Sequence, residues 1–307
     1  MQSKRVISLY ILAIIAIAAV LVLSGCASPT PTVTPTTTPT VSTTPTPAPG
    51  PKEKLLMSTT TSMQDTGLLD YLKPYFDNLY NMDLQWTSKG SGQALADGRL
   101  GNVDVLIVHS PADEKKFVDD GYGWNRTQFA HNFYVIVGPA NDPAGIKNMT
   151  NASQAFAKIR EQKAKFISRG DNSGTNAKEL TLWNMTGTAP SNKTESAWYI
   201  STGQGMGATL QMADQMQAYT LSDLSTFIHS QKNLTLAIMV ESDPSNLINK
   251  YDVIAINHTM YPSSNYAGAM KFIEFMTSPE TQKKISEFGI ADYGRPLFYA
   301  DLLNKTT

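Results

Sequence analysis

The sequence predicts an α/β fold, and three observations indicate it. Short apolar runs such as 103–108 and 132–137 have the length and continuous hydrophobicity of strands buried in a parallel sheet. Segments with a helical spacing of apolar residues, such as 67–76 and 152–164, alternate with these runs. Several strand-like segments end in stretches rich in Ser, Thr and Gly that lead directly into a helix. In open parallel sheets ligands bind at the carboxyl ends of the strands, so the same pattern predicts where a site would lie.

Length and composition narrow the function classes. With 307 residues, 41% of them hydrophobic, the chain can bury one large core or two medium ones. A formal net charge of -1 argues against an electrostatic nucleic-acid binder, which needs a basic excess. Four histidines and one cysteine leave little material for a transition-metal site or a disulfide framework.

Residues 1–25 have the features of an export signal, because the basic residues Lys4 and Arg5 precede a long apolar run. The run is also long enough to span a bilayer, so a retained anchor is the alternative. Its end, Leu-Ser-Gly-Cys, resembles a prokaryotic lipobox, in which the signal is cut before Cys26 and the thiol is lipidated. In either case we expect an exported protein held at the outer face of the cytoplasmic membrane.

A spacer follows the signal. Residues 26–52 comprise Cys26 and a segment composed largely of Ser, Thr, Pro and Val, with too few apolar residues for a core and prolines that keep it extended. We interpret this segment as a stalk without a binding role.

The chain is also rich in Asn-x-Ser/Thr triplets, the acceptor pattern for N-linked glycans. Such triplets arise by chance, but their density leads to the hypothesis of an exported glycoprotein from an archaeal cell surface. They lie at Asn125, Asn148, Asn151, Asn184, Asn192, Asn233, Asn257 and Asn304.

The globular part opens with two strand-to-helix junctions. A strand at 54–58 leads through the hydroxyl run 59–62 into the amphipathic helix 67–76. A second strand at 83–87 leads through the Ser- and Gly-rich stretch 88–95 into another helix. The second stretch lacks the Gly-Lys-Ser/Thr ending of a nucleotide-binding loop, so a nucleotide site is disfavoured.

The stretch 166–175 (Phe-Ile-Ser-Arg-Gly-Asp-Asn-Ser-Gly-Thr) is the most informative junction. It is predicted to end a strand, turn sharply and open a helix that continues to about residue 184. A helix N-terminus offers unpaired backbone N–H groups, and Arg169 adds a planar fork that suits a tetrahedral anion. An ordinary helix cap beside a surface arginine is the alternative. A further stretch of this kind, 201–209, favours the oxyanion site.

The remaining segments continue the alternation. We expect helices at 113–118, 208–216 and 222–228, and a short strand and turn at 218–223. Two more strands are expected at 234–240 and 251–257, and two terminal helices at 267–276 and 279–288.

No set of catalytic residues is apparent. The chain has no Gly-x-Ser-x-Gly elbow and no His-Glu-x-x-His motif, which disfavours a hydrolase and a zinc enzyme. The four histidines, His109, His131, His229 and His258, are scattered, and we interpret each as a strand-end or surface residue. Binding without catalysis is therefore favoured over an enzyme.

Taken in order, these junctions and the 294–298 segment (Gly-Arg-Pro-Leu-Phe) resemble the solute-binding proteins of ABC importers, and among them the tungstate-binding proteins. The resemblance covers roughly residues 54–302. It implies a type II periplasmic-binding-protein fold with two lobes, each a mostly parallel sheet flanked by helices. It further implies that residues 53–130 plus 258–307 form lobe 1 and residues 131–257 form lobe 2. Strands near 133–138 and 251–257 would cross between the lobes as a hinge.

The resemblance also implies a set of ligand-binding residues in the cleft. Lobe 1 would contribute two turns and lobe 2 an arginine, a helix N-terminus and two side chains that face the cleft. Tyr219 could instead pack in the core. The sequence around it, taken without the resemblance, slightly favours core packing. The implied residues are Thr60, Thr61, Ser62, Ser91, Gly92, Arg169, Ser173, Gly174, Thr175, Met206 and Tyr219.

The ligand implied is tungstate, with no cofactor and no metal cation, and the implied partners are the permease and ATPase subunits of the importer. We expect a monomer that binds neither nucleic acid nor a substrate for catalysis. Molybdate, sulfate or phosphate binding on the same scaffold, or an extracytoplasmic sensor module, are the alternatives. Cavity size can reject the smaller sulfate, whereas molybdate matches tungstate in size and charge and is separated from it only by fine geometry.

Overall fold

The computed structural model describes residues 51–191 and 193–303. The predicted signal, Cys26 and nearly all of the stalk lie outside the described residues, and these assignments stay predictions. In the part of the chain that the structure describes, no helix is both long enough and apolar enough to cross a membrane.

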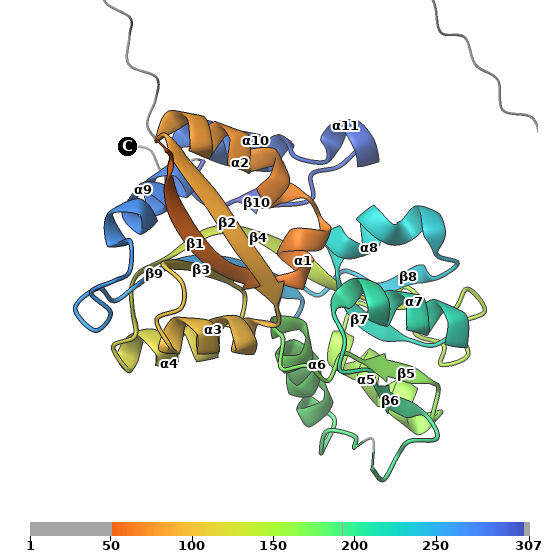
Figure 1. The fold of residues 1–307 in the computed structure, drawn as a ribbon. Coiled ribbons are helices and arrows are strands. Elements are labelled where there is room, and N and C mark those ends of the chain that lie inside the picture. The colour runs from red at the N-terminus through yellow and green to blue at the C-terminus, as the bar shows by residue number, and fades with distance from the viewer. Residues whose placement is uncertain (1–50, 192, 304–307) are drawn as a thin grey trace, which may run out of the picture. The chain divides into compact units, whose positions relative to one another are not determined.

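The predicted α/β fold is confirmed, and its first half is built on three parallel strands. β1 (Glu53–Thr60) pairs in parallel with β2 (Met82–Lys89) on one side and with β3 (Val105–Val108) on the other. The carboxyl ends of these strands therefore meet at one edge of the sheet. The helices that connect and cover them are α1 (Thr61–Asp65), α2 (Leu68–Leu79), α3 (Ser91–Arg99) and α4 (Pro111–Asp119). In Figure 1, α2 lies on the opposite side of the β1–β2 strands from α3 and α4.

Two long antiparallel strands make the sheet mixed, whereas the resemblance predicted mostly parallel sheets. β4 (Gly123–Gly138) pairs antiparallel with β9 (Ile248–Ile256), which also pairs antiparallel with β3. The last residues of β4 pair instead with β7 (Thr220–Asp223) and β8 (Ala237–Val240). The chain leaves the first sheet along β4 and returns along β9, so these two strands must run in opposite directions.

The segment between β4 and β9 carries its own small parallel sheet. β5 (Phe166–Ser168) and β6 (Tyr199–Ser201) pair in parallel, and Phe166 also bridges to Tyr219 beside β7. The helices here are α5 (Ala152–Glu161), α6 (Gly174–Met185), α7 (Met206–Met216), α8 (Leu224–Ser230) and the short 3-10 helix η1 (Gln231–Asn233).

The C-terminal elements return to the first sheet. α9 (Tyr266–Thr277) packs on β9 and α10 (Pro279–Glu287) on α9, followed by α11 (Ile290–Tyr293) and β10 (Tyr299–Ala300), which pairs with β4 (Figure 1). This return is consistent with the predicted discontinuous lobe 1. The lobe boundaries themselves stay a prediction.

The largest apolar cluster spans both parts of the chain, since it contains Phe76 of α2 as well as Met206 of α7. The predicted amphipathic face of α2 is confirmed, since Leu68, Leu72 and Phe76 are buried in the largest cluster. Around β5, a second cluster is centred on Trp183, whose ring centroid lies 5.1 Å from that of Phe166. These packed clusters fix the strand ends, and with them the turns described below.

Candidate functional site

The first turn of the site follows β1. Thr60 caps α1 by accepting a hydrogen bond from the backbone N–H of Met63, and its hydroxyl lies 3.2 Å from that of Ser62. Thr59, the residue before, is buried and its hydroxyl has no hydrogen-bond partner among the described residues. The sequence folds this way because the strand ends in hydroxyl residues, which cap helices well.

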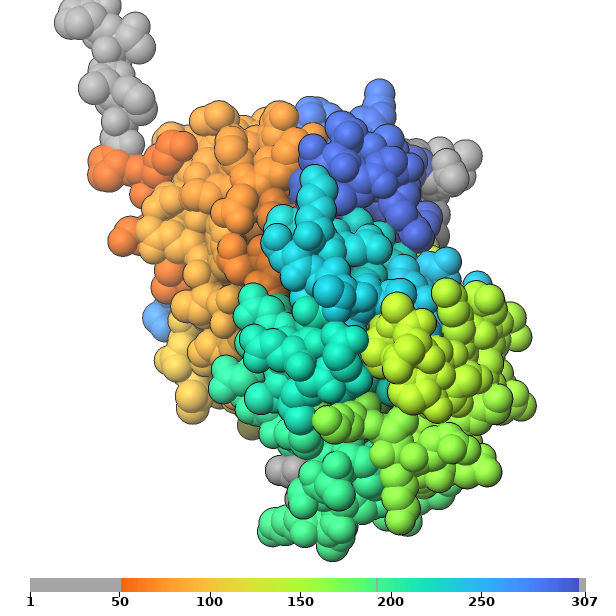
Figure 2. All heavy atoms as spheres, turned by 90° about the vertical axis from the view of Figure 1, so that its right-hand side faces the viewer, coloured from red at the N-terminus to blue at the C-terminus, as the bar shows by residue number. Residues whose placement is uncertain are grey.

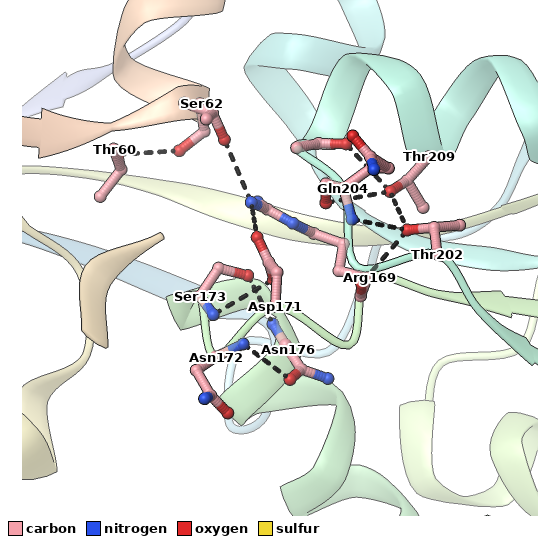
Figure 3. Close-up of polar contacts among 12 residues, drawn as sticks. Thr60, Ser62, Arg169, Asp171, Asn172, Ser173, Asn176, Thr202, Gln204 and Thr209 are labelled. Carbon is pink, nitrogen blue, oxygen red and sulfur yellow. Dashed lines mark hydrogen bonds and ion pairs between the residues drawn. The ribbon is translucent and has the colours of Figure 1, made fainter. Parts of the chain in front are cut away.

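The second turn follows β5 and holds Arg169. Gly170 has φ +60°, and a Cβ built on it would lie 1.7 Å from the hydroxyl of Ser201, so the sharp turn after Arg169 requires glycine. The carbonyl of Arg169 accepts hydrogen bonds from the backbone N–H of Gly203 at 2.7 Å and from the hydroxyl of Thr202 at 3.2 Å. The backbone of Arg169 is thus fixed by the 201–203 segment (Figure 3).

The guanidinium of Arg169 reaches from this turn to the first one. Its Nη2 donates to the hydroxyl of Thr61 at 3.1 Å. The same nitrogen pairs with the carboxylate of Asp171 at 2.5 Å, as Figure 3 shows. The residue is only 1% exposed. Its other two nitrogens, Nε and Nη1, are buried without a hydrogen-bond partner among the described residues.

The N-terminus of α6 is the third part of the site. Ser173 caps the helix by accepting a hydrogen bond from the backbone N–H of Asn176, and its own N–H donates to Asp171. The N–H groups of Gly174 and Thr175 lie in the first turn, where the helix itself offers no acceptor. The hydroxyl of Thr175 is buried and lacks a partner among the described residues.

The fourth part of the site is the turn after β2, which contacts the turn before α6. Ser91 is fully buried, and the backbone N–H of Gly92 donates to the carbonyl of Asn172 at 3.1 Å. A Cβ on Gly92 would lie 2.9 Å from that carbonyl oxygen, so glycine permits this close approach. The backbone N–H of Gly92 is therefore already engaged.

Two predicted residues are not brought into this group. Met206 begins α7, but its side chain is buried in the largest apolar cluster. The hydroxyl of Tyr219 donates to Asp142 at 2.7 Å and accepts from the backbone N–H of Ala144 at 2.9 Å. Because these bonds and its contact with Gly138 place Tyr219 in core packing, the prediction that it faces the cleft needs correction.

Two residues that contact the site escaped the sequence reasoning. Asp171 pairs with Arg169, and His109 lies 3.4 Å from the Ser62 hydroxyl through its Nε2. His109 directly follows the buried β3, a position that sequence reasoning could have used as a signal. Burial, reinforced by the nearby charge of Arg169, lowers the pKa of His109 to about 4, so its ring is neutral at neutral pH.

Two further carboxylates lie within electrostatic range of Arg169. Burial, reinforced by the charge of Asp223, raises the pKa of Asp65 to about 6. Burial likewise raises the pKa of Asp223, while Arg169 acts in the opposite direction. Burial thus disfavours the charged forms of these two carboxyl groups, and no hydrogen bond joins them to each other among the described residues.

The donors are enclosed rather than open to solvent. On the face drawn in Figure 2, the segments of α7 and α8 (teal and cyan) lie against the orange part that begins the described chain and the blue part that ends it. This agrees with the contacts of α1 with both helices. The hollows of about 390 and 410 Å³ beside α6 are lined by His109 and by Gly92, respectively, but not by Arg169. An enclosed set of hydroxyl, guanidinium and backbone donors is suited to hold a small anion.

Comparisons with known proteins agree with this fold. Residues 33–280 match the family model of a PBP superfamily domain. The tungstate-binding protein TupA of Peptoclostridium acidaminophilum is 45% identical over 249 residues, which are 80% of this chain and 85% of that protein.

Two solved structures are similar over most of the described chain. The tungstate-binding protein TupA from Desulfovibrio alaskensis G20 is 44% identical with a TM-score of 0.68, covering 81% of this chain and 99% of that one. The tungstate ABC transporter structure from Geobacter sulfurreducens is 44% identical with a TM-score of 0.69, covering 77% and 99%.

Proposed function

The chain belongs to the PBP superfamily, and from this premise we propose that it binds tungstate outside the cell and delivers it to an ABC importer. The names of the similar proteins from Peptoclostridium and Desulfovibrio support tungstate as the ligand. No catalytic step is part of the proposal. The permease and ATPase subunits of the importer would be its partners.

The unpaired buried donors carry the proposal. Arg169 Nε and Nη1 and the hydroxyls of Thr175 and Thr59 are all buried without partners among the described residues. Leaving a buried polar group unsatisfied costs about 1–3 kcal/mol, and more for a charged group. The turns that carry these donors are joined by the hydrogen bonds of Arg169 with Thr61 and of Asp171 with Arg169 and Ser173. Donors on joined turns are best explained by an acceptor that they share, and a tetrahedral oxyanion offers four oxygens.

A dianion fits these donors better than a neutral ligand. Arg169 supplies one positive charge, which Asp171 partly offsets, and hydroxyl and backbone N–H groups supply the remaining hydrogen bonds. An anion that loses its hydration on burial requires such replacement donors. Molybdate has the same shape and charge and is the alternative ligand, whereas the smaller sulfate would leave some donors out of reach.

Closure of two lobes would complete this donor shell. In the proposed division, residues 53–130 plus 258–307 carry Thr61 and Gly92, and residues 131–257 carry Arg169 and Asn172. The hydrogen bonds from Arg169 to Thr61 and from Gly92 to Asn172 then join the lobes. The closed form would be the one that the importer recognises.

Membrane attachment belongs to the proposal as well. The lipidated Cys26 would hold the protein at the outer face of the membrane through the Ser/Thr/Pro-rich stalk. The intact mass of the protein extracted from its cells tests this, because cleavage before Cys26 and diacylation change the mass by a defined amount.

Calorimetric titration of the purified protein with tungstate, molybdate, sulfate and phosphate tests the function. We expect one tungstate ion per chain, bound far more tightly than sulfate or phosphate. Binding of none of the four anions would overturn the proposal. Tighter binding of molybdate than tungstate would change the assigned ligand and leave the site in place.

A further inference from the structure

His109 contacts three parts of the candidate site, the turns after β1 and β2 and the N-terminus of α6, and these three are the anion turns. Its Nε2 lies 3.4 Å from the Ser62 hydroxyl, and its backbone N–H donates to the hydroxyl of Ser91, also at a long 3.4 Å. It also packs on the first turn of α6, since a Cβ on Gly174 would lie 2.4 Å from the His109 carbonyl oxygen and 2.6 Å from Nδ1. One residue therefore contacts the turns after β1 and β2 and the turn that opens α6.

The other edge of the same ring contacts both predicted crossing strands. Nδ1 lies 3.0 Å from the hydroxyl of Tyr134 on β4 and 2.9 Å from Oδ1 of Asn249 on β9. The ring also stacks on Tyr251 of β9 at a centroid distance of 5.0 Å. Through Asn249, the network continues to Asn132 of β4 at 2.8 Å.

The hydrogen-bond network assigns the tautomer. Oδ1 of Asn249 only accepts hydrogen bonds, because the amide nitrogen of that residue already donates to Asn132 and Tyr251. Nδ1 of His109 must then carry the proton, which leaves Nε2 as an acceptor facing the Ser62 hydroxyl. The neutral ring thus donates a hydrogen bond to β9 through Nδ1 and faces the turn after β1 through Nε2.

We propose that His109 is a positioning residue that couples the three anion turns to the crossing strands β4 and β9. The inference rests on the proposed oxyanion binding and deepens it. A ligand that draws the Ser62 turn and the α6 N-terminus together moves the ring between them. Because the same ring is bonded to β4 and β9, that movement bends these two paired strands where they pass between the proposed lobes, and the bend in turn sets the ligand turns.

Two substitutions separate the two edges of the ring. His109→Asn keeps a polar group near the Nδ1 position, facing the strands, and loses the group near Ser62. His109→Gln keeps a polar group near the Nε2 position and loses the strand contact. Coupling predicts that both variants bind tungstate more weakly by on the order of tenfold. Both should also show a smaller decrease in radius of gyration on tungstate addition, as measured by small-angle X-ray scattering.

The remaining outcomes each overturn the inference or the function. A variant His109→Gln with wild-type affinity would limit the role of His109 to the Ser62 turn and refute coupling. Lower stability towards urea with unchanged affinity and unchanged compaction would show packing alone. If the wild-type protein binds no oxyanion, the proposed function fails first and this inference with it.

Two further variants serve as a control and as a replacement for the His109 variants. His258→Gln makes the same change at an exposed histidine and should leave affinity and compaction unchanged. Should both His109 variants fail to fold, Tyr134→Phe removes only the hydroxyl that contacts Nδ1. It should weaken tungstate binding by about threefold, and unchanged affinity in this folded variant would refute the coupling.

A second inference comes from the Asn-x-Ser/Thr triplets, whose asparagines differ sharply in accessibility. Asn148, Asn184 and Asn233 are exposed, and their side-chain nitrogens donate no hydrogen bond to any residue that the structure describes. Asn257 is the opposite case, because it is buried and its Nδ2 donates to the carbonyl of Gly121 at 2.7 Å.

We infer that Asn148, Asn184 and Asn233 carry N-linked glycans and that Asn257 does not. Transfer forms a bond between Nδ2 and C1 of the first sugar, breaks the bond from C1 to a polyprenyl phosphate carrier, and releases one amide proton. A glycan on Asn257 would displace the bond to Gly121 and could not fit in the folded protein. At Asn184, the glycan would lie about 15 Å along α6 from the anion turn, given the helical rise.

Glycopeptide mass spectrometry of the protein from its native cells tests this assignment. Peptides with the three exposed asparagines should carry added sugar mass, and the peptide with Asn257 should have its bare mass. The single substitutions Asn148→Gln, Asn184→Gln and Asn233→Gln should each increase gel mobility by one step, and Asn257→Gln should not. Bare masses at all three exposed positions would overturn the inference.

Discussion

Arg169→Lys isolates the hydrogen-bonding role of the arginine from its charge. In the structure, Nη2 holds Thr61 at 3.1 Å and Asp171 at 2.5 Å, while Nε and Nη1 are buried without a partner in the part of the chain that the structure describes. A lysine ammonium keeps the charge and can replace the Nη2 contacts. It cannot also supply the two donors of the planar fork.

The expected magnitude follows from those two donors. A hydrogen bond to a charged group contributes about 1.5–3 kcal/mol, so losing both weakens tungstate binding by about 3–6 kcal/mol. This corresponds to an increase in Kd of about 10²- to 10⁴-fold. Stability should change much less, because Asp171 keeps a positive partner. Titration calorimetry, with competition by a weaker anion where binding is too tight, measures the change.

The choice of lysine over alanine matters for interpretation. Arg169→Ala would leave the carboxylate of Asp171 without its cationic partner, and removing one partner of a buried pair costs about 3–5 kcal/mol of stability. Arg160→Lys, in which the altered residue donates to carbonyls elsewhere on the chain, serves as the control. A Kd for Arg169→Lys within threefold of the wild type, in a folded protein, would refute the site.

Three further changes test other parts of the structure. Gly92→Ala places a Cβ 2.9 Å from the Asn172 carbonyl oxygen, so we expect tungstate binding at least tenfold weaker with little change in thermal stability. Wild-type affinity in this variant would contradict the proposal that Gly92 and Asn172 meet when the lobes close. Tyr219→Phe removes the hydroxyl bonded to Asp142, so unfolding should become easier by about 1 kcal/mol while affinity stays constant, and a large loss of affinity would return Tyr219 to the site. Burial lowers the pKa of His109 from its ordinary 6.5 to about 4, so the unfolded chain takes up a proton that the folded chain resists as the pH falls through this interval. The free energy of unfolding is therefore not reduced by His109 above pH 6.5, and it decreases by up to about 3 kcal/mol as the pH falls towards 4. Urea unfolding measured between pH 7.5 and 4.5 should show this decrease. In His109→Gln the free energy of unfolding should fall less steeply with pH.

The sequence predicted the framework of the site better than its packing. Ser, Thr and Gly at strand ends are local signals, and they correctly indicated the junctions that place Thr61 and Arg169 3.1 Å apart. The roles of other residues depend on contacts between distant segments, which a single sequence does not reveal. His109 became important only because β4 and β9 lie against its ring. Tyr219 sits at a similar junction, but its hydroxyl meets Asp142, 77 positions away.

The pairing of Arg169 with Asp171 explains how a chain of net charge -1 can bury an anion site. An isolated guanidinium that is 1% exposed would be costly, and the carboxylate offsets that cost before any ligand arrives. The same carboxylate occupies Nη2 and accepts from the N–H of Ser173, so it orients the fork and the start of α6 together. The pair then acts on a dianion as an oriented dipole, and the hydroxyls and backbone N–H groups carry the larger share of the binding. Such donors leave no trace in net charge, which is why composition alone gave no sign of an anion-binding protein.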